Sequence, residues 1–179
     1  MLSDFDIVSL DGVRIPCSRK VLEDQWPWFR QELEAYIFAV EDGLPLSDSN
    51  NASANGAVDG QRHDKAVVQS HQLLLPENGS VVTAILQYFY SLNLITQLQH
   101  SLPVLVSLLL FARQYDLTNL RALVVHALHV SLSNNQGSAA AIYEAAALGG
   151  CIALQTRALK MMMNVSAISL VPSCRKTVS

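Results

Sequence analysis

The most constraining feature of this sequence is a strongly apolar stretch near its middle. From Leu102 to Ala112 only Pro103 and Ser107 interrupt the run of apolar side chains. The run is too short to cross a bilayer, which takes about 20 apolar residues. Pro103 suits the first turn of a helix, where its missing N–H breaks no hydrogen bond. The sequence therefore predicts a helix over residues 102–120 that is buried on nearly all sides.

Composition and cysteine usage bound the class of protein. The chain has 179 residues, of which 50% are hydrophobic and 15% charged, enough for one domain with a sizeable core and part of a second. A net charge of −3 and no cluster of Lys and Arg with interleaved aromatic residues disfavour nucleic-acid binding. Cys17, Cys151 and Cys174 are widely spaced and form no CxxC pair, which is typical of a reducing compartment. With no signal-peptide pattern at the N-terminus, we expect a cytoplasmic protein, with the nucleus as the alternative, and no membrane partner.

The N-terminal residues predict a β-hairpin. The segments 5–10 and 13–17 alternate apolar and polar side chains on either side of Asp11-Gly12. Asp-Gly between alternating segments is a strong hairpin signal because glycine accepts a positive φ without steric strain, so we expect a two-residue turn. Ser18 is then placed to cap a short helix that ends near Pro27.

A second helix and an insertion follow. Apolar residues spaced three and four apart predict an amphipathic helix from Trp28 to about Val40. Residues 43–65 are rich in Ser, Asn, Asp and Gly and cannot bury enough surface to offset their ordering entropy. We interpret them as a disordered inserted loop, with a regulated or partner-binding loop as the alternative.

The remainder of the chain predicts one strand and then mostly helices. Leu73 to Leu75 form a strand, and Ser80 is the expected cap of the next helix. Further helices follow the apolar stretch, and the last two form a pair separated by Gly149-Gly150. The inward residues expected in the last helix, which runs to Met163, are Leu154, Ala158, Leu159 and Met162. The run Met161-Met162-Met163 either packs the end of that helix or offers an adaptable contact.

No pattern of catalytic or ligating residues stands out. His126 and His129 share a helix face, but a zinc site needs three or four ligands and no acidic residue or cysteine lies within a turn of them. A GxSxG nucleophile elbow, a phosphate loop and a dinucleotide fingerprint are all missing from the sequence. We therefore expect no enzyme activity, no cofactor and no metal site.

The order of these elements and the residues in them resemble a BTB/POZ domain. The matching residues are Asp6-Ile7-Val8 in the first strand, Val21-Leu22, Pro27 and Trp28-Phe29 in the first helices, Tyr88-Phe89-Tyr90, and Leu108, Leu109, Leu110, Ala112, Leu117 and Leu120 in and after the leucine-rich helix. The resemblance implies an α+β fold with a small β-sheet packed on a cluster of helices. It covers residues 1–132, and residues 133–163 resemble the first helical pair of a BACK domain, as in fungal kelch-BTB proteins. Residues 164–179 are expected to form a flexible tail.

The resemblance implies a role in protein–protein interaction without catalysis. The expected activity is oligomerisation or the binding of an adaptor or scaffold, and the alternative is a substrate adaptor that binds the cullin scaffold of a ubiquitin ligase. In such adaptors a hydrophobic-x-Glu motif follows the second helix, and the nearest candidate is Ala39-Val40-Glu41 with the flanking Phe38. Large aromatic residues dominate the energy of many interfaces. The candidate interface residues are Trp26, Trp28, Tyr36, Phe38 and Glu41, with core packing as the equal alternative for the two tryptophans.

Overall fold

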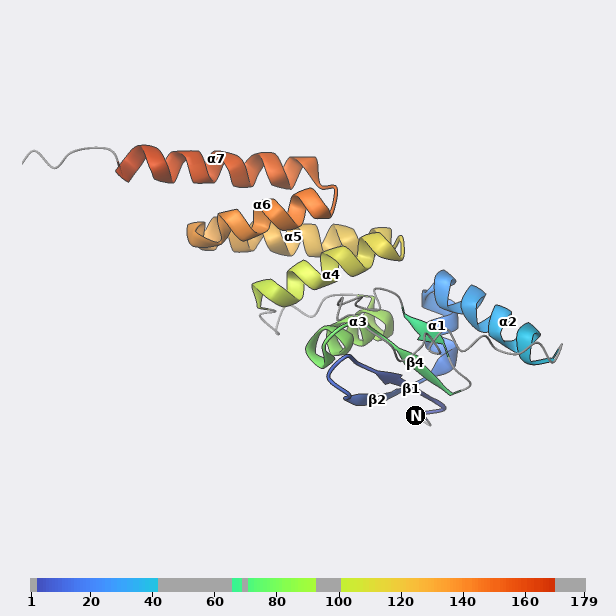
Figure 1. The fold of residues 1–179 in the computed structure, drawn as a ribbon. Helices are drawn as coiled ribbons and strands as arrows, with labels where there is room; N and C mark the ends of the chain where they lie inside the picture. The colour runs from blue at the N-terminus through green and yellow to red at the C-terminus, as the bar shows by residue number, and fades with distance from the viewer. Residues whose placement is uncertain (1–2, 42–65, 69–70, 93–100, 170–179) are drawn as a thin grey trace, which may run out of the picture. The chain divides into compact units, whose positions relative to one another are not determined.

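The computed structural model describes residues 3–41, 66–68, 71–92 and 101–169 (Figure 1). These residues form a mixed α+β fold, in which a small four-stranded sheet is accompanied by helices. The predicted fold class is therefore confirmed. The predicted inserted loop over residues 43–65 lies outside the described residues.

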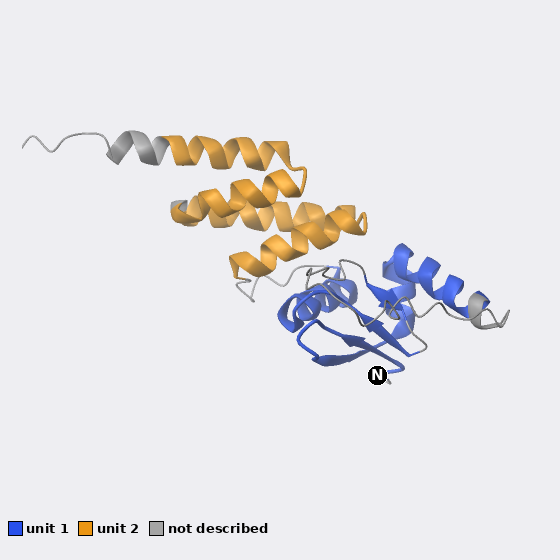
Figure 2. Ribbon diagram, in the orientation of Figure 1, with its two compact units in different colours: residues 1–95 blue, residues 96–179 orange. Residues whose placement is uncertain are grey.

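The chain divides into two compact units, Met1–Ile95 and Thr96–Ser179 (Figure 2). The hairpin and the sheet belong to the first unit, and the apolar stretch that begins at Leu102 belongs to the second. Compactness does not identify a family. The division into a BTB/POZ part and a BACK-like part therefore stays a prediction.

The sheet of the first unit is built around its first strand. The strands are β1 (Phe5–Val8), β2 (Arg14–Cys17), β3 (Val67–Val68) and β4 (Gln72–Leu74). They lie in the order β2-β1-β4-β3, with β1 antiparallel to β2 and parallel to β4. Ile7 therefore lies opposite both Ile15 and Leu73, and the side chains of Ile7 and Leu73 are fully buried. Their burial ties the hairpin to the rest of the first unit.

The predicted hairpin is confirmed, but its turn is longer than predicted. Ser9 and Val13 still pair, since the Ser9 N–H donates to the Val13 carbonyl at 3.0 Å. The loop is therefore Leu10-Asp11-Gly12, and the Gly12 N–H donates to the Ser9 carbonyl at 2.9 Å. Gly12 has a φ of 77°, as the left-handed residue of a three-residue hairpin loop requires. The prediction of a two-residue turn was wrong because Ser9, and not Leu10, pairs with Val13, which adds Leu10 to the loop.

Asp11 connects the hairpin loop to the start of a helix 68 residues later. Its carboxylate accepts hydrogen bonds from the Gly79 N–H at 3.0 and 3.2 Å, at the first residue of α3 (Gly79–Ser91). The Ser9 hydroxyl also donates to this carboxylate. Beside it, the Leu10 N–H donates to the Glu77 carbonyl at 2.8 Å. An acidic group at a helix N-terminus satisfies an unpaired N–H and is favoured by the helix dipole.

The first helix is capped in the same way by a distant carboxylate. In α1 (Arg19–Gln25), the N–H of Arg19 donates to Asp4 Oδ1 at 2.9 Å. Ser18 occupies the N-cap position but its side chain makes no capping bond, and Ser80 lies inside α3 behind an N-cap at Asn78. The prediction that the Ser18 and Ser80 side chains cap these helices is thus wrong. The helix N–H groups donate instead to the carboxylates of Asp4 and Asp11.

Helices α1, α2 (Pro27–Glu41) and α3 provide the other side chains of the first core. The α2 helix confirms the predicted amphipathic helix, and Pro27 is its first residue. The large fully buried or nearly buried side chains of this unit include Phe5, Ile7, Leu22, Trp26, Phe29, Leu33, Leu73, Val82, Ile85 and Phe89.

The second unit is helical within the described part of the chain. Its elements are α4 (Leu102–Gln114), α5 (Thr118–Asn134), a 3₁₀ turn (Gln136–Ser138), α6 (Ala139–Leu148) and α7 (Ile152–Ser169). The predicted flexible tail is corrected here, because α7 continues through residues 164–169. Residues 170–179 lie outside the described part.

The apolar stretch forms a shorter and less buried helix than predicted. It ends at Gln114, and Asp116 turns the chain with a φ of 52° before α5 begins. The Leu117 N–H then donates to the Ala112 carbonyl at 2.8 Å, which satisfies one of the last free carbonyls of the helix. Only one stripe of α4 is buried, at Leu105, Leu108, Leu109, Phe111 and Ala112, and its other apolar residues are half-buried.

A close approach between α4 and the end of α6 closes the second core. A Cβ atom on Gly149 would lie 2.7 Å from Leu109 Cδ2, which is closer than packed atoms come. Gly150 follows with a φ of 65° and turns the chain into α7. Arg121 donates to the carbonyls of Gly149 and Gly150, each at 3.0 Å. The predicted break at the glycine pair is confirmed, and its reason includes packing as well as backbone freedom.

The Asp11 contact predicts a pH-dependent stability of the first unit. Hydrogen bonds from Ser9 and then Gly79 lower the pKa of Asp11 below its usual value. Such a group stabilises the folded state above its unfolded-state pKa, and this contribution is lost as the pH falls through the folded-state pKa. We expect Asp11→Ala to lower the free energy of unfolding at neutral pH, by an amount that shrinks toward acidic pH.

Denaturant unfolding followed by tryptophan fluorescence measures this effect, because both tryptophans lie in the first unit. Asp24→Ala is the matched control, since Asp24 is an exposed aspartate whose ion pair with Arg30 is long, at 3.9 Å. An equal loss in the two variants at neutral pH would contradict the role assigned to Asp11.

Candidate interaction surfaces

The described residues hold neither a membrane-spanning helix nor a metal cluster. None of their helices is long and apolar enough to cross a bilayer. Among the same residues there is no group of three or more His, Cys, Asp or Glu side chains that could hold a metal ion. The described helices do carry aromatic, apolar and polar patches.

The predicted aromatic cluster is mainly part of the core. The side chain of Trp26 is 0% exposed and is stacked against Phe29 and Phe89, at ring-centroid distances of 6.1 and 5.5 Å. Trp28 lies 5.1 Å from Trp26 and is half-buried. Phe5 meets Phe29 edge to face at 5.4 Å. The structure therefore corrects the assignment of Trp26 to an interface, because no partner can reach a fully buried ring.

The other candidate interface residues lie on α2 but do not form one surface. Tyr36 is half-buried, whereas Phe38 is 64% exposed. Residues two apart on a helix do not face each other, so Tyr36 and Phe38 point to different sides. Glu41 is the last residue of α2, and its side chain lies outside the described part of the structure. Of the five predicted residues, Phe38 is the one that the structure places in the open.

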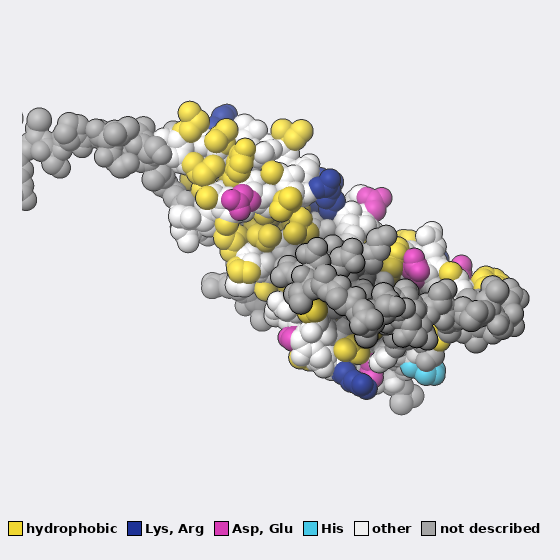
Figure 3. Space-filling model, in the orientation of Figure 1, with side chains coloured by type: hydrophobic (Ala, Val, Ile, Leu, Met, Phe, Trp, Pro, Cys, Tyr) yellow, Lys and Arg dark blue, Asp and Glu magenta, His cyan; other side chains and the backbone are white. Residues whose placement is uncertain are grey.

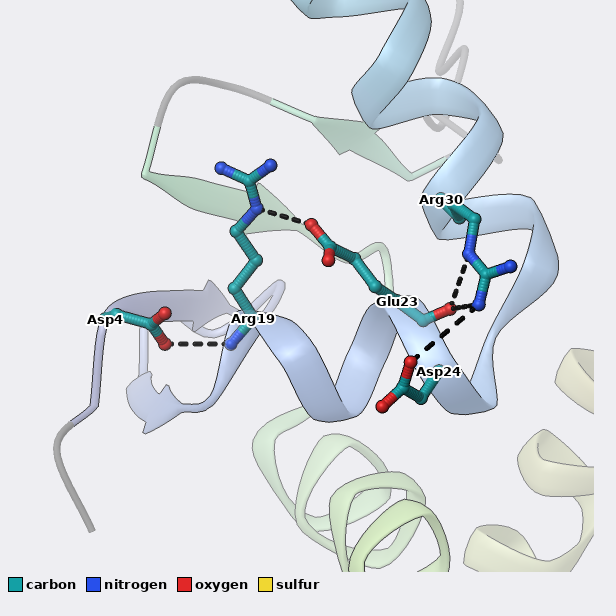
Figure 4. A network of polar contacts seen from close by, with 5 residues as sticks. All are labelled: Asp4, Arg19, Glu23, Asp24 and Arg30. Carbon is teal, nitrogen blue, oxygen red and sulfur yellow. Dashed lines mark hydrogen bonds and ion pairs between the residues drawn. The ribbon is translucent and has the colours of Figure 1, made fainter.

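A polar network joins α1 to α2 (Figure 4). Arg30 donates through Nε and Nη2 to the Glu23 carbonyl, at 3.0 and 2.6 Å. Arg19 pairs with the Glu23 carboxylate at 2.6 Å. These groups line a cavity of about 320 Å³ whose other lining residues include Leu33 and Ile37. Because both arginines already have partners within the chain, the network is best explained as a cap on the C-terminal end of α1 that fixes the turn into α2.

Helix α7 carries apolar side chains on two opposite faces. Leu154 and Ala158 are fully buried. At 3.6 residues per turn, Ile152, Leu159 and Met163 fall on the other side, where they are 76%, 43% and 64% exposed. We call these three residues the α7 apolar row. Figure 3 shows apolar side chains gathered over α6 and α7 on the face that it displays.

The α7 apolar row was only partly visible in the sequence. Inward positions at Leu154 and Ala158 are confirmed, and Met162 is half-buried. Leu159 was predicted to point inward and is instead exposed. The methionine run is divided in the same way, since Met163 is exposed and the two before it are half-buried. The spacing of seven residues from Ile152 to Leu159, and of four from Leu159 to Met163, was the signal that could have separated the two faces.

The cysteines of the described residues show no sign of reactivity. The Cys17 thiol is buried and donates to the Phe5 carbonyl at 3.5 Å. Burial and then the nearby Asp6 and Asp4 raise the pKa of Cys17 to about 12, which keeps the thiol protonated. Cys151 is half-buried and unbridged. Cys174 lies outside the described residues.

The chain is similar in sequence to a known protein but matches no family model. The chain is similar to protein ral2 of Schizosaccharomyces pombe, with 27% identity over 174 residues. The match covers 92% of this chain and 26% of ral2, so the chain spans about a quarter of the length of that relative. At this identity the match does not assign a family.

The burial of Trp26 predicts the result of removing it. Trp26→Ala should lower the free energy of unfolding by roughly 3–5 kcal/mol, as for other large-to-small changes of buried aromatic residues. Phe38→Ala, at the exposed position on α2, should stay within about 0.5 kcal/mol of the parent chain. Denaturant unfolding followed by far-ultraviolet circular dichroism measures both. A Trp26→Ala variant as stable as the parent would contradict the core assignment.

Proposed function

We propose that this chain is a protein–protein interaction module of the BTB/POZ type with a BACK-like helical pair, and that it has no catalytic activity. Its partner in this proposal is a second copy of the chain, and the contact is made by the α7 apolar row. The arrangement of a small sheet with helices agrees with the expectation drawn from the sequence. The residue matches at both ends of the first unit support the same reading. A cytoplasmic or nuclear location belongs to this proposal as well.

The observation that carries the proposal is the second apolar face of α7. A surface helix of a globular protein normally shows one apolar stripe toward the core and a polar face toward water. In α7 the buried stripe is already supplied by Leu154 and Ala158, so the α7 apolar row is not needed for folding. A contiguous patch of exposed apolar side chains is typical of an interaction site.

The distribution of charge favours a second copy as the partner. Residues 1–95 contain 13 Asp and Glu against 6 Lys and Arg, whereas residues 96–179 contain 2 against 6. The basic unit that carries the row thus complements the acidic unit of another copy. Complementary surfaces of this kind guide association and favour one partner over another.

Light scattering on the intact chain tests this proposal. At tens of micromolar, the average mass should exceed the monomer mass of 19.6 kDa. Ile152→Asp should return it to the monomer, because a charge at the most exposed position of the row would have to be desolvated in the contact. Added salt should also weaken the association, since it screens the charges of the two units.

Val130→Asp provides the matched control for this experiment. Val130 lies on α5, outside the row, and is 48% exposed. This variant should associate like the parent chain. A parent chain that is monomeric at these concentrations, or equal losses in the two variants, would refute the self-association proposed for the row.

A second candidate function is the cullin adaptor, and the exposure of Phe38 favours it. An aromatic ring that is 64% exposed on α2, three residues before Glu41, is available to a partner of that kind. In this case the chain should capture a cullin scaffold in a pull-down, and Phe38→Ala should abolish capture without loss of stability. Capture that Phe38→Ala leaves unchanged, or no capture at all, would remove the candidate.

A further inference from the structure

A shallow, open pocket lies between α5 and α7 in the second unit. It has a volume of about 400 Å³ and is lined by His126, His129, Val130, Ser133 and Arg157. The two histidines are three residues apart on α5, and Arg157 reaches the pocket from α7. The lining within the described part of the chain thus combines two imidazoles, a guanidinium and a hydroxyl, without an acidic group.

The guanidinium of Arg157 is held by a hydrogen bond to an uncharged side chain, and no acidic side chain among the described residues pairs with it. Its Nη2 donates to Ser133 Oγ at 3.0 Å, and the Ser133 hydroxyl donates to the His129 carbonyl at 3.0 Å. No ion pair of Arg157 occurs among the described residues. Arginine has five N–H donors, so most of the guanidinium is left for a ligand. The charge of Arg157 therefore stays uncompensated within the pocket.

The imidazole of His129 is partly buried, and its surroundings favour the uncharged form. Its Nδ1 is buried and has no hydrogen-bond partner within the described residues. Burial first, and then the positive Arg157 and His126, lower the pKa of His129, so the ring is neutral at pH 7. A neutral imidazole carries one N–H, and with its proton on Nε2 the ring can donate to a ligand.

The surroundings of the pocket also favour an anion. The second unit contains only two acidic residues in the whole of residues 96–179, Asp116 and Glu144, and neither lines the pocket. An anion bound here would meet the guanidinium of Arg157 and no acidic side chain in the lining. The exposed side chain of Val130 gives the pocket an apolar wall beside its donors.

We propose that this pocket binds one phosphate group, carried by a phosphorylated side chain of a partner protein. A phosphate monoester brings close to two negative charges and three acceptor oxygens, which suit a planar guanidinium and two imidazole N–H donors. The wall formed by Val130 contacts the carbon chain that carries the phosphate. The source of the phosphate rests on the proposed function in protein interaction, whereas the affinity of the pocket for phosphate does not.

Nuclear magnetic resonance of the imidazole nitrogens tests the pocket directly. The intact chain is titrated with inorganic phosphate and with O-phosphoserine, and chloride keeps the ionic strength constant. We expect saturable shifts of the His126 and His129 ring signals at millimolar ligand, and a rise in the pKa of His129 when the anion is bound. Serine, which lacks the phosphate, should cause no shift.

Two variants on α7 separate a specific site from general attraction. Arg157→Gln should weaken binding about tenfold or more, because it removes the charged hydrogen-bond donor. Lys160→Gln removes the same charge from an exposed position three residues away and should bind like the parent chain. Both variants should fold, since Arg157 makes one side-chain hydrogen bond to an exposed serine and Lys160 makes none among the described residues.

The outcomes also distinguish this proposal from self-association. The Ile152→Asp variant should bind phosphate as the parent chain does, whether or not the parent self-associates. An absence of saturable shifts, or equal binding by Arg157→Gln, would overturn the pocket. Binding of inorganic phosphate without binding of O-phosphoserine would overturn its assignment to a modified side chain.

Discussion

The hydrogen bonds from the Gly79 N–H to the Asp11 carboxylate, together with the burial of Ile7 and Leu73, are the contacts that hold the first unit together. The hydrogen bonds join a hairpin loop to a helix that starts 68 residues later, and the parallel pairing of β1 with β4 runs beside them. Bringing such distant segments together has an entropic cost that grows only slowly with the length of chain between them. A few buried and charge-assisted contacts at the junction can therefore hold the two segments in one register.

The second unit differs because its described elements are all helices. Packing between helices alone therefore positions the side chains on which the two proposals rest. The close approach of Leu109 to Gly149 sets how α4 lies against the end of α6, and Gly150 then starts α7. Helix α7 in turn offers its apolar row on one side and Arg157 on another. The two proposed activities, self-association and phosphate binding, thus use separate sides of one helix and can be tested independently.

Most of the secondary structure could be predicted, but the partners of individual side chains could not. The hairpin, the α2 helix and the break at Gly149-Gly150 followed from local patterns of apolar residues, glycine and proline. The serine caps failed because the acceptors come from Asp4 and Asp11, far away in the sequence. Trp26 was a candidate for an interface as much as for the core, because the sequence places more aromatic residues near this helix than its burial requires. Only the stacking of Trp26 on Phe89 decided that it belongs to the core.

The sequence by itself determined the α+β class, the positions of most elements and the excess of basic over acidic residues after residue 95. These depend on periodicity and composition, which are local properties of the chain. The tertiary structure decided which face of each helix is buried, and hence that Leu159 is exposed and that His126, His129 and Arg157 line one pocket. The physical reason is that α5 and α7 are separated by α6 in the chain, and no local pattern records which of their side chains meet when the helices pack.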